Sequence, residues 1–333
     1  MLSFYRSLFF TASCLLAMPV LHAQQDPMFT RYAFNSLSFN PAYAGSNDHL
    51  AAALIHRKQW IGIKGAPSTQ SLTLHSPLQN ERIGLGCNMA LDKAGPLQVL
   101  GADLSYAYRF PLGDAMRLSL GVQAGMVNWS SSRNDLSLEN PTDVVFQNNL
   151  NRTVPNFGAG IYLSSERFYA GIGCPRLVEY SLHKASADRD GFYGRMYRHY
   201  YATIGAAFPL LDEVLVLKPA VLVKTTGLFS NLRQDAAFQN VGTPTAIDVE
   251  TSLFFLQTLW VGVAFRTAVQ INTSSADSFD LWTAWYLRNG LRLGLAFDIP
   301  VNGLLSTSPG SLQLLAGYEF DIKVRKVVPP RYF

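Results

Sequence analysis

The sequence has little charge. Only 15% of its 333 residues are Asp, Glu, Lys or Arg, whereas soluble domains carry roughly 25%. Lys plus Arg number 27 against 23 Asp plus Glu, too small an excess for a nucleic-acid binder. The 21 Phe, 15 Tyr and 5 Trp residues exclude an intrinsically disordered chain, because so many aromatic side chains are enough to bury a core.

Cysteine and histidine are also scarce. Cys14 lies in an export segment described below, so only Cys87 and Cys174 remain in the mature chain. They are able to form one disulfide, but both lie in apolar runs, so two buried thiols are favoured. The histidines show no His-x-x-x-His spacing, and no local motif marks a nucleophile. We therefore expect no metal site, no cofactor and no enzymatic activity.

Long hydrophobic runs are missing from the mature chain. A membrane-spanning helix needs about 20 mostly apolar residues, and the longest charge-free run, residues 299–318, contains Pro300 and Pro309. Residues 1–23, which precede the mature chain, do contain an apolar stretch. A basic residue, an apolar stretch and the ending Leu21-His22-Ala23 predict a secretory signal cleaved after Ala23.

What the sequence does contain is alternation. In residues 115–126, apolar side chains such as Leu118 and Leu120 alternate with polar or small ones such as Ser119. Successive side chains of a strand point to opposite faces, so this pattern predicts a strand with one apolar and one polar surface. Fourteen such segments begin near Leu50, Ser68, Glu81, Leu97, Ala115, Val154, Arg167, Arg198, Glu213, Thr245, Thr258, Ser278, Leu291 and Gly310.

The connections between these segments alternate between short turns and longer loops. The turns include a Pro-Leu-x-(Asn/Asp) pattern that occurs three times, at residues 77–80, 111–114 and 209–212. The loops include residues 129–153, 175–197 and 225–244. Outer-membrane barrels have short periplasmic turns and long outside loops. The sequence thus predicts an all-β, transmembrane antiparallel outer-membrane β-barrel of about 14 strands, with both termini periplasmic. A soluble β-sandwich is the disfavoured alternative.

Aromatic and charged residues refine this prediction. Aromatics near strand ends fit interfacial girdles: Tyr106, Tyr108, Phe110, Tyr200, Tyr201, Trp282, Trp285 and Tyr286. The polar faces carry both signs, which predicts a lumen charge network of Arg82, Asp103, Arg109, Arg117, Asp248, Glu250, Arg266, Asp280, Arg292, Asp298 and Glu319. Structural salt bridges filling the lumen are favoured over a selective pore, because a selective pore would more often present one sign. Gly-x-Gly pairs on the strands indicate a lumen stripe of small residues.

The two ends of the mature chain do not read as strands. Residues 24–49 are rich in Asn, Ser, aromatics and Pro, and we expect either a plug in the barrel mouth, which is favoured, or a docking strand for a partner. Residues 50–322 then form the barrel. Residues 323–333 form a basic, Pro-containing tail that lies in the periplasm, where it either meets an acidic partner or serves as a solubilising end.

Several motifs resemble one known family. The opening Gln25-Asp26-Pro27-Met28-Phe29-Thr30-Arg31-Tyr32, then Asn40-Pro41-Ala42-Tyr43-Ala44-Gly45-Ser46, is similar to that of the PorP/SprF family of the type IX secretion system from the Bacteroidetes. Arg57-x-Gln59-Trp60, Gly84-Leu85-Gly86 and the final Pro330-Arg331-Tyr332-Phe333 match as well. The partner-binding or plug candidates are Phe29, Tyr32, Asn40, Pro41, Tyr43, Arg57 and Trp60.

The resemblance implies a non-enzymatic, multi-pass protein of the cell outer membrane. Its relatives take part in exporting proteins with C-terminal sorting domains, in gliding motility, or in holding a secreted adhesin at the surface. The implied partners are outer-membrane lipid, the periplasmic ring and peptidoglycan-linked lipoproteins of the machinery, and a secreted surface adhesin or its C-terminal domain. The alternative function is a passive outer-membrane channel or hydrophobic-solute transporter.

Overall fold

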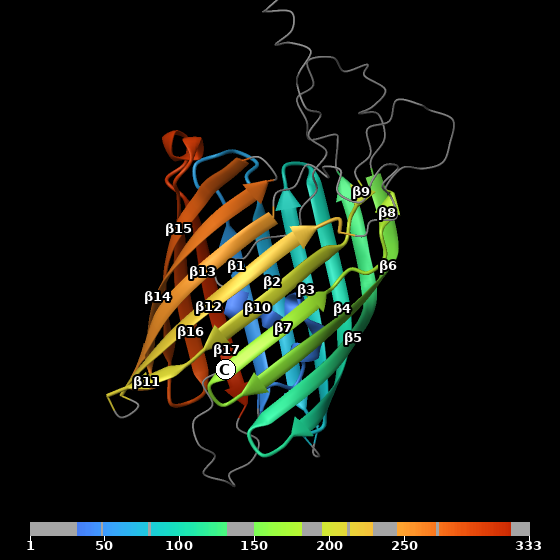
Figure 1. Ribbon diagram of the computed structural model, residues 1–333. Coiled ribbons are helices and arrows are strands. Elements are labelled where there is room, and N and C mark those ends of the chain that lie inside the picture. Colours follow the sequence, from blue (N-terminus) through green and yellow to red (C-terminus); the bar gives the residue numbers. More distant parts are fainter. Residues whose placement is uncertain are drawn as a thin grey trace, which may run out of the picture.

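The computed structural model describes residues 32–47, 49–78, 81–131, 150–181, 195–211, 214–228, 245–270 and 273–320. The expected signal sequence and the C-terminal tail lie outside these ranges. Among the described residues, no helix is both long enough and apolar enough to cross a membrane. Strands dominate instead, and they follow one another around a tilted cylinder (Figure 1).

The strands and short helices have the following bounds. The wall strands are β1 (Leu50–Lys58), β2 (Ser68–Pro77), β3 (Ile83–Ala94), β4 (Leu97–Leu112), β5 (Met116–Ser131), β6 (Leu150–Ser165), β7 (Phe168–Cys174), β10 (His199–Ala206), β11 (Phe208–Leu210), β12 (Leu215–Thr226), β13 (Thr245–Phe255), β14 (Leu259–Gln270), β15 (Thr273–Tyr286), β16 (Leu291–Pro300) and β17 (Ser311–Phe320). The short strands β8 (Tyr180–Ser181) and β9 (Arg195–Met196) form a separate pair. The 3-10 helices are η1 (Tyr32–Ser38), η2 (Pro41–Tyr43) and η5 (Gly303–Ser306).

The sheet closes on itself. Every neighbouring pair is antiparallel, and β1 pairs with β17 from Leu50 opposite Phe320 to Lys58 opposite Leu312. On the other side β10 pairs with β12, and β11 continues the same wall position below β10. The result is a closed barrel of 14 strands. Closure satisfies the backbone N–H and C=O groups that an open edge would leave unpaired in lipid, at several kcal/mol each.

Apolar side chains face outward from the barrel and polar side chains face inward, the reverse of a soluble protein. On β5 the outward side chains Leu120, Val122 and Met126 are 44%, 57% and 60% exposed, while the inward Ser119 and Gln123 are buried. The same alternation runs through β2 and β4. An apolar outer surface is stable only when hydrocarbon covers it, because water penalises each exposed apolar Å² by about 25 cal/mol. The fold is therefore that of an outer-membrane barrel.

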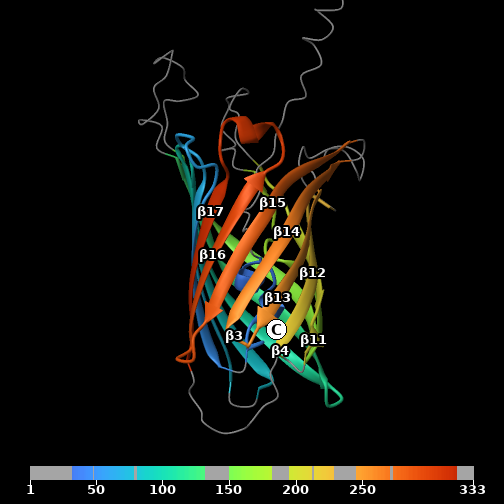
Figure 2. The ribbon, with the colours of Figure 1, turned by 90° about the vertical axis from the view of Figure 1, so that its left-hand side faces the viewer.

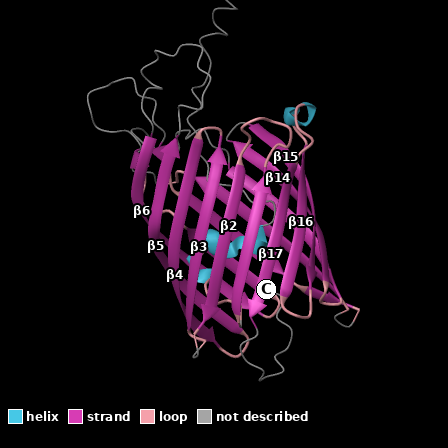
Figure 3. Cartoon of the chain, turned by 180° about the vertical axis from the view of Figure 1, so that it is seen from behind, coloured by secondary structure: helices cyan, strands magenta, loops and turns pink. Residues whose placement is uncertain are grey.

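Two ends of the barrel differ. At one end, β1 begins, β17 ends and short turns join β2 to β3, β4 to β5, β6 to β7, β11 to β12, β13 to β14 and β15 to β16. We call this the short-turn end. The longer connections lie at the opposite end, here called the long-loop end, where η5 sits at the rim (Figures 2 and 3). This end also has two connections of only two residues, residues 95–96 between β3 and β4 and residues 271–272 between β14 and β15, so the alternation of short turns and longer loops expected from the sequence is not complete.

The structure corrects some expectations about strand length and facing. The ladder between β5 and β6 runs up to Ser131 opposite Leu150, past the predicted start of the loop at residue 129. Polar side chains extend it, since Asn128 hydrogen-bonds to Asn151 and Thr153 across the pair. Trp282 and Tyr201, expected in an interfacial girdle, instead point into the lumen and are buried.

The lipid-facing surface leads to a first prediction. Leu104, midway along β4, is 68% exposed on the outer face, so Leu104→Arg should lower the free energy of unfolding in phospholipid vesicles by roughly 2–4 kcal/mol. Urea titration followed by tryptophan fluorescence measures the loss. Leu305→Arg is the matched control, because Leu305 is 55% exposed in η5 beyond the wall. Equal losses for the two variants would contradict the assignment of the outer face to lipid.

Candidate functional site

An N-terminal segment of the chain occupies the lumen. Residues 34–46, here called the plug, run through η1 and η2 inside the barrel (Figure 3) and contact β2, β3, β4, β5 and β6. η2 starts where its sequence favours a start: the side chain of Asn40 accepts a hydrogen bond from the N–H of Ala42, and Pro41 takes the first helical position. The plug contains no charged residue, so no ion is buried with it.

The wall beneath the plug is lined with glycine. A Cβ at Gly121 of β5 would overlap the backbone of Ala42, and a Cβ at Gly160 of β6 would overlap the side chain of Asn40. We call this surface the glycine seat. Its other members with a similar close approach are Gly84 and Gly173. The small-residue stripe of the sequence thus serves to let the plug backbone lie directly on the wall strands, a close approach that only glycine permits.

Aromatic side chains fix the plug laterally. Phe34 packs edge-on against Trp260 and Trp282, with ring centroids 5.8 and 5.7 Å away. Phe39 stacks on Tyr201 at 5.4 Å. Tyr43 lies between His75 and Tyr162, each 5.3 Å away. Such pairs contribute roughly 0.5–1.5 kcal/mol each beyond the area they bury.

Hydrogen bonds between the plug and the wall strands fix the orientation of the plug. The Asn35 amide donates to Ser71 Oγ at 3.2 Å, Ser38 Oγ donates to Asn88 Oδ1 at 2.8 Å, and Asn40 Nδ2 donates to the carbonyl of Ile161 at 3.0 Å. Burial raises the pKa of Tyr43 above its ordinary value, so its hydroxyl stays protonated at neutral pH.

The partner-binding or plug candidates of the sequence are placed as follows. Asn40, Pro41 and Tyr43 lie in η2 or at its cap, on the glycine seat. Phe29 and the side chain of Tyr32 are outside the described residues. Arg57 is buried on β1 and pairs with Asp298 of β16 across the intervening strand β17, so it belongs to the lumen charge pairs. Trp60 is 38% exposed just beyond β1, at the long-loop end.

The charged lumen residues form pairs. Arg266 on β14 makes two hydrogen bonds to Asp248 on β13, at 2.8 and 3.0 Å, and its Nη2 is 3.7 Å from Asp280 on β15. Arg292 Nη1 lies 3.2 Å from Glu319 Oε1, and Asn156 donates to Asp103 Oδ1 at 2.7 Å. Glu250 and Arg109 are buried as well.

Two arginines of the predicted lumen network lie at the short-turn end of the barrel. Arg82 precedes β3 and is exposed at the short-turn end, and Arg117, at the start of β5, pairs at 3.0 Å with the exposed Glu81. Both follow a turn, where the strand alternation that assigns a side chain to one face has barely begun. Among the described residues, no group of three or more His, Cys, Asp or Glu is arranged to hold a metal ion.

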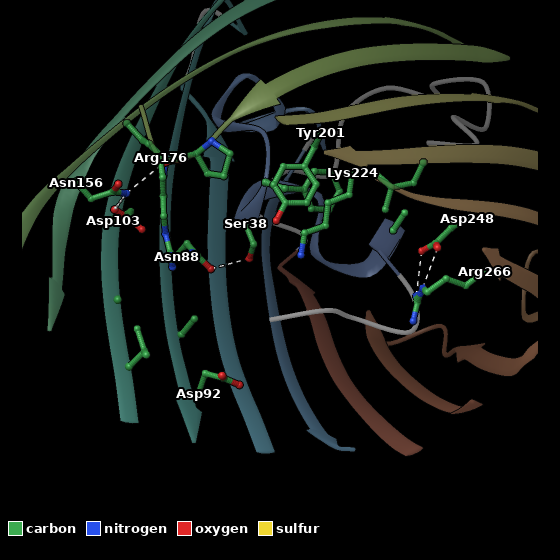
Figure 4. Close-up of a pocket in the computed structure, with 18 residues that line it drawn as sticks. Ser38, Asn88, Asp92, Asp103, Asn156, Arg176, Tyr201, Lys224, Asp248 and Arg266 are labelled. Carbon is green, nitrogen blue, oxygen red and sulfur yellow. Dashed lines mark hydrogen bonds and ion pairs between the residues drawn. The ribbon is translucent and has the colours of Figure 1, made fainter. Parts of the chain in front are cut away.

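A cavity lies between the plug and the long-loop end. It has a volume of about 90 Å³, and Ser38 and Phe39 of the plug contribute to its lining. Figure 4 shows Lys224 and Tyr201 side by side, with Ser38 hydrogen-bonded to Asn88 and Asp248 facing Arg266. The plug therefore closes one side of this cavity, here called the vestibule, which both polar and apolar side chains line.

Sequence reasoning missed several residues that hold the plug. Trp260, Tyr162 and Tyr201 form its aromatic sockets, and the Lys218 ammonium lies 3.7 Å from the ring centroid of Trp260. The signal available in the sequence was a large aromatic on the polar face of a strand, such as Tyr162 between Gly160 and Ser164.

Comparisons with known proteins agree with this architecture. A sequence model of the family described as "Type IX secretion system membrane protein PorP/SprF" matches residues 21–318. None of the curated proteins compared with the chain matches it significantly.

Solved structures of outer-membrane barrels are similar in fold. The CymD monoaromatic hydrocarbon channel has a TM-score of 0.52 at 12% identity, covering 84% of this chain and 91% of that one. A Pseudomonas aeruginosa FadL homologue gives 0.47 at 13%, covering 90% and 96%, and the Acinetobacter baumannii protein Omp33 gives 0.44 at 9%, covering 82% and 98%. At these identities the likeness concerns the fold alone.

The glycine seat leads to a second prediction. Gly121→Ala should displace the plug, because the added Cβ meets the backbone of Ala42 rather than a movable side chain. Amide hydrogen exchange of residues 35–45 should then accelerate at least tenfold. Gly101→Ala is the control, since Gly101 is also buried but its nearest Cβ neighbour, Val127, is 3.9 Å away. Unchanged exchange in Gly121→Ala would show that the plug does not depend on the seat.

The buried ion pairs lead to a third prediction. Arg266→Leu leaves Asp248 and Asp280 without their cation, so the free energy of unfolding should fall by roughly 3–5 kcal/mol. Arg117→Leu removes an exposed pair and should cost about 1 kcal/mol or less. Urea unfolding in vesicles compares the two. Similar losses would mean that burial does not determine the strength of these charge pairs.

Proposed function

The chain belongs to the PorP/SprF family of type IX secretion system membrane proteins, and on this premise we propose that it acts as a non-enzymatic anchor and scaffold of the machinery. It is a multi-pass outer-membrane protein. The scaffold role assigns one task to each part of the molecule. The wall fixes the protein in lipid, and the two ends bind other components.

The observation that carries this proposal is the plug on its glycine seat. The chain's own segment occupies the lumen beside the vestibule and touches five consecutive wall strands. Ring contacts hold it on both sides of the barrel, at Trp260 and at Tyr162. A diffusion channel would need this space for its solute. A scaffold needs a rigid barrel, and the plug contributes contacts across the interior that an empty lumen would lack.

The orientation and the partners follow from the same proposal. We place both termini and the short-turn end in the periplasm, as in other outer-membrane barrels. The periplasmic ring and the peptidoglycan-linked lipoproteins of the machinery would then bind at the short-turn end. A secreted surface adhesin, or its C-terminal domain, would bind at the long-loop end, where the vestibule opens.

A fourth prediction tests the scaffold against a passive channel or hydrophobic-solute transporter. In planar bilayers the purified protein should give no stable open steps, whereas a variant lacking residues 24–46 should give them because its lumen is empty. A strain without the gene should lose export of proteins with C-terminal sorting domains, and the intact gene should restore it.

The outcomes separate the two functions. Stable open steps from the intact protein, together with normal secretion in the deletion strain, would favour the channel and overturn the scaffold. Secretion restored by an Asn40→Ala variant as well as by the intact gene would show that the cap of η2 is dispensable for export.

A further inference from the structure

Two exposed lysines lie on the outer face of neighbouring strands at the long-loop end. Lys58 is the last residue of β1, and Lys93 is the last but one of β3. Both side chains point away from the lumen, because the adjacent Arg57 is buried and the adjacent Asp92 lines the vestibule. Ser68 of β2 lies opposite Lys58 on one side and opposite Lys93 on the other. The three residues therefore form one row across the outer face of the barrel.

A third lysine lies close to this row. Lys64 is exposed in the connection between β1 and β2, and the next residue, Gly65, accepts a hydrogen bond at its carbonyl from the N–H of Gly95, at 2.9 Å. That bond holds the connection against the turn that follows Lys93. Neighbouring strands lie about 4.8 Å apart, so the backbones of Lys58 and Lys93 are roughly 10 Å apart. We call Lys58, Lys64 and Lys93 the lysine patch.

No carboxylate of the described residues neutralises the patch. None of its three ammonium groups makes an ion pair or a hydrogen bond with the part of the chain that the structure describes. The two acidic residues of β1 to β4, Asp92 and Asp103, line the vestibule inside the barrel. Outward side chains at the same end of β5, β6, β12 and β13 are neutral: Asn128, Ser130, Asn151, Thr153, Thr225 and Thr245. Positive charge is thus concentrated on one side of the barrel.

The wall next to the patch faces hydrocarbon. Leu54, Leu72 and Met89 lie opposite one another on β1, β2 and β3 and are 52%, 38% and 45% exposed. They are four residues from the row of the patch, which is about 13 Å along a strand. Trp60, just beyond β1, is 38% exposed, and tryptophan is enriched at membrane interfaces. The patch therefore lies where the hydrocarbon ends and the lipid headgroups begin.

We propose that the lysine patch binds the phosphate groups of an anionic membrane lipid whose acyl chains lie along Leu54, Leu72 and Met89. Each ammonium group offers three hydrogen-bond donors to phosphate oxygens, and the Ser68 hydroxyl offers another between Lys58 and Lys93. An acidic protein is the competing occupant, but it would have to displace lipid from the apolar rows beside the patch. The orientation proposed above places this site in the outer leaflet. Lipid binding itself does not depend on the scaffold function.

Native mass spectrometry of the purified protein tests this site with two lipid probes, bisphosphorylated lipid A and the same glycolipid without its phosphates. The intact protein should bind the phosphorylated probe at least tenfold more tightly. Lys58→Gln with Lys93→Gln should weaken that binding roughly 30-fold, which is about 2 kcal/mol for two lysines near an anionic lipid surface. Lys58→Arg with Lys93→Arg keeps the charge and should bind within about twofold of the parent.

A matched control removes the same charge elsewhere. Arg167 and Arg288 are exposed at the short-turn end, so Arg167→Gln with Arg288→Gln should leave the affinity for the phosphorylated probe unchanged. The urea midpoint of the lysine variant in phosphatidylcholine vesicles should equal that of the parent, because its two lysines make no side-chain pair within the described chain. Lost binding then cannot be ascribed to unfolding.

Four results would overturn the proposal. Equal affinity for the two probes would mean that phosphate is not recognised, and displacement of the lipid by inorganic phosphate alone would mean a site for free anions. An equal loss in the control variant would mean that net charge attracts the lipid. Undiminished binding by the lysine variant would leave an acidic protein as the occupant of the patch. Export is measured separately in cells, so failure of the scaffold function would leave the lipid site standing, and the reverse.

Discussion

Satisfaction of the backbone in hydrocarbon is the constraint on which the rest of this structure depends. A strand that faces lipid has no water to bond its N–H and C=O groups, so each strand needs two neighbours and the sheet has to close. The pairing of β1 with β17, and of β10 with β12, meets that requirement. Even β11, only three residues long, pairs with β12 and so continues the wall below β10.

Closure with 14 strands creates the second problem, an interior too wide for the wall side chains to fill. The chain solves it with a neutral plug and a glycine seat, which depend on each other. Glycines such as Gly121 let the plug backbone reach the wall, and the plug removes the space that those missing side chains would leave. Charges on the remaining lumen face are then buried, so Arg266 has to be matched by Asp248 and Asp280.

The fold was largely predictable because strand alternation is local. β1, β2, β4 and β13 begin at the residues that the pattern indicates. The error over Trp282 was avoidable, since Trp282 and Trp285 are three residues apart on one strand and therefore face opposite sides. The plug sockets were not predictable, because contacts such as Phe34 with Trp260 join residues more than two hundred positions apart. Periodicity carries no information about such pairs.

The interior of the barrel and its short-turn end differ in how well the residue types suit the backbone. Inside the barrel, the ring contacts, the cap of η2 and the ion pairs each stabilise the fold. The residue types on the lumen face therefore need no explanation beyond folding. At the short-turn end the sequence opposes the backbone, with Leu211 and Leu256 in a conformation that favours Asn or Gly. Local conflict of this kind persists where selection acts on something other than folding. Folding therefore accounts for the contacts inside the barrel, but it does not account for leucine at these two turn positions.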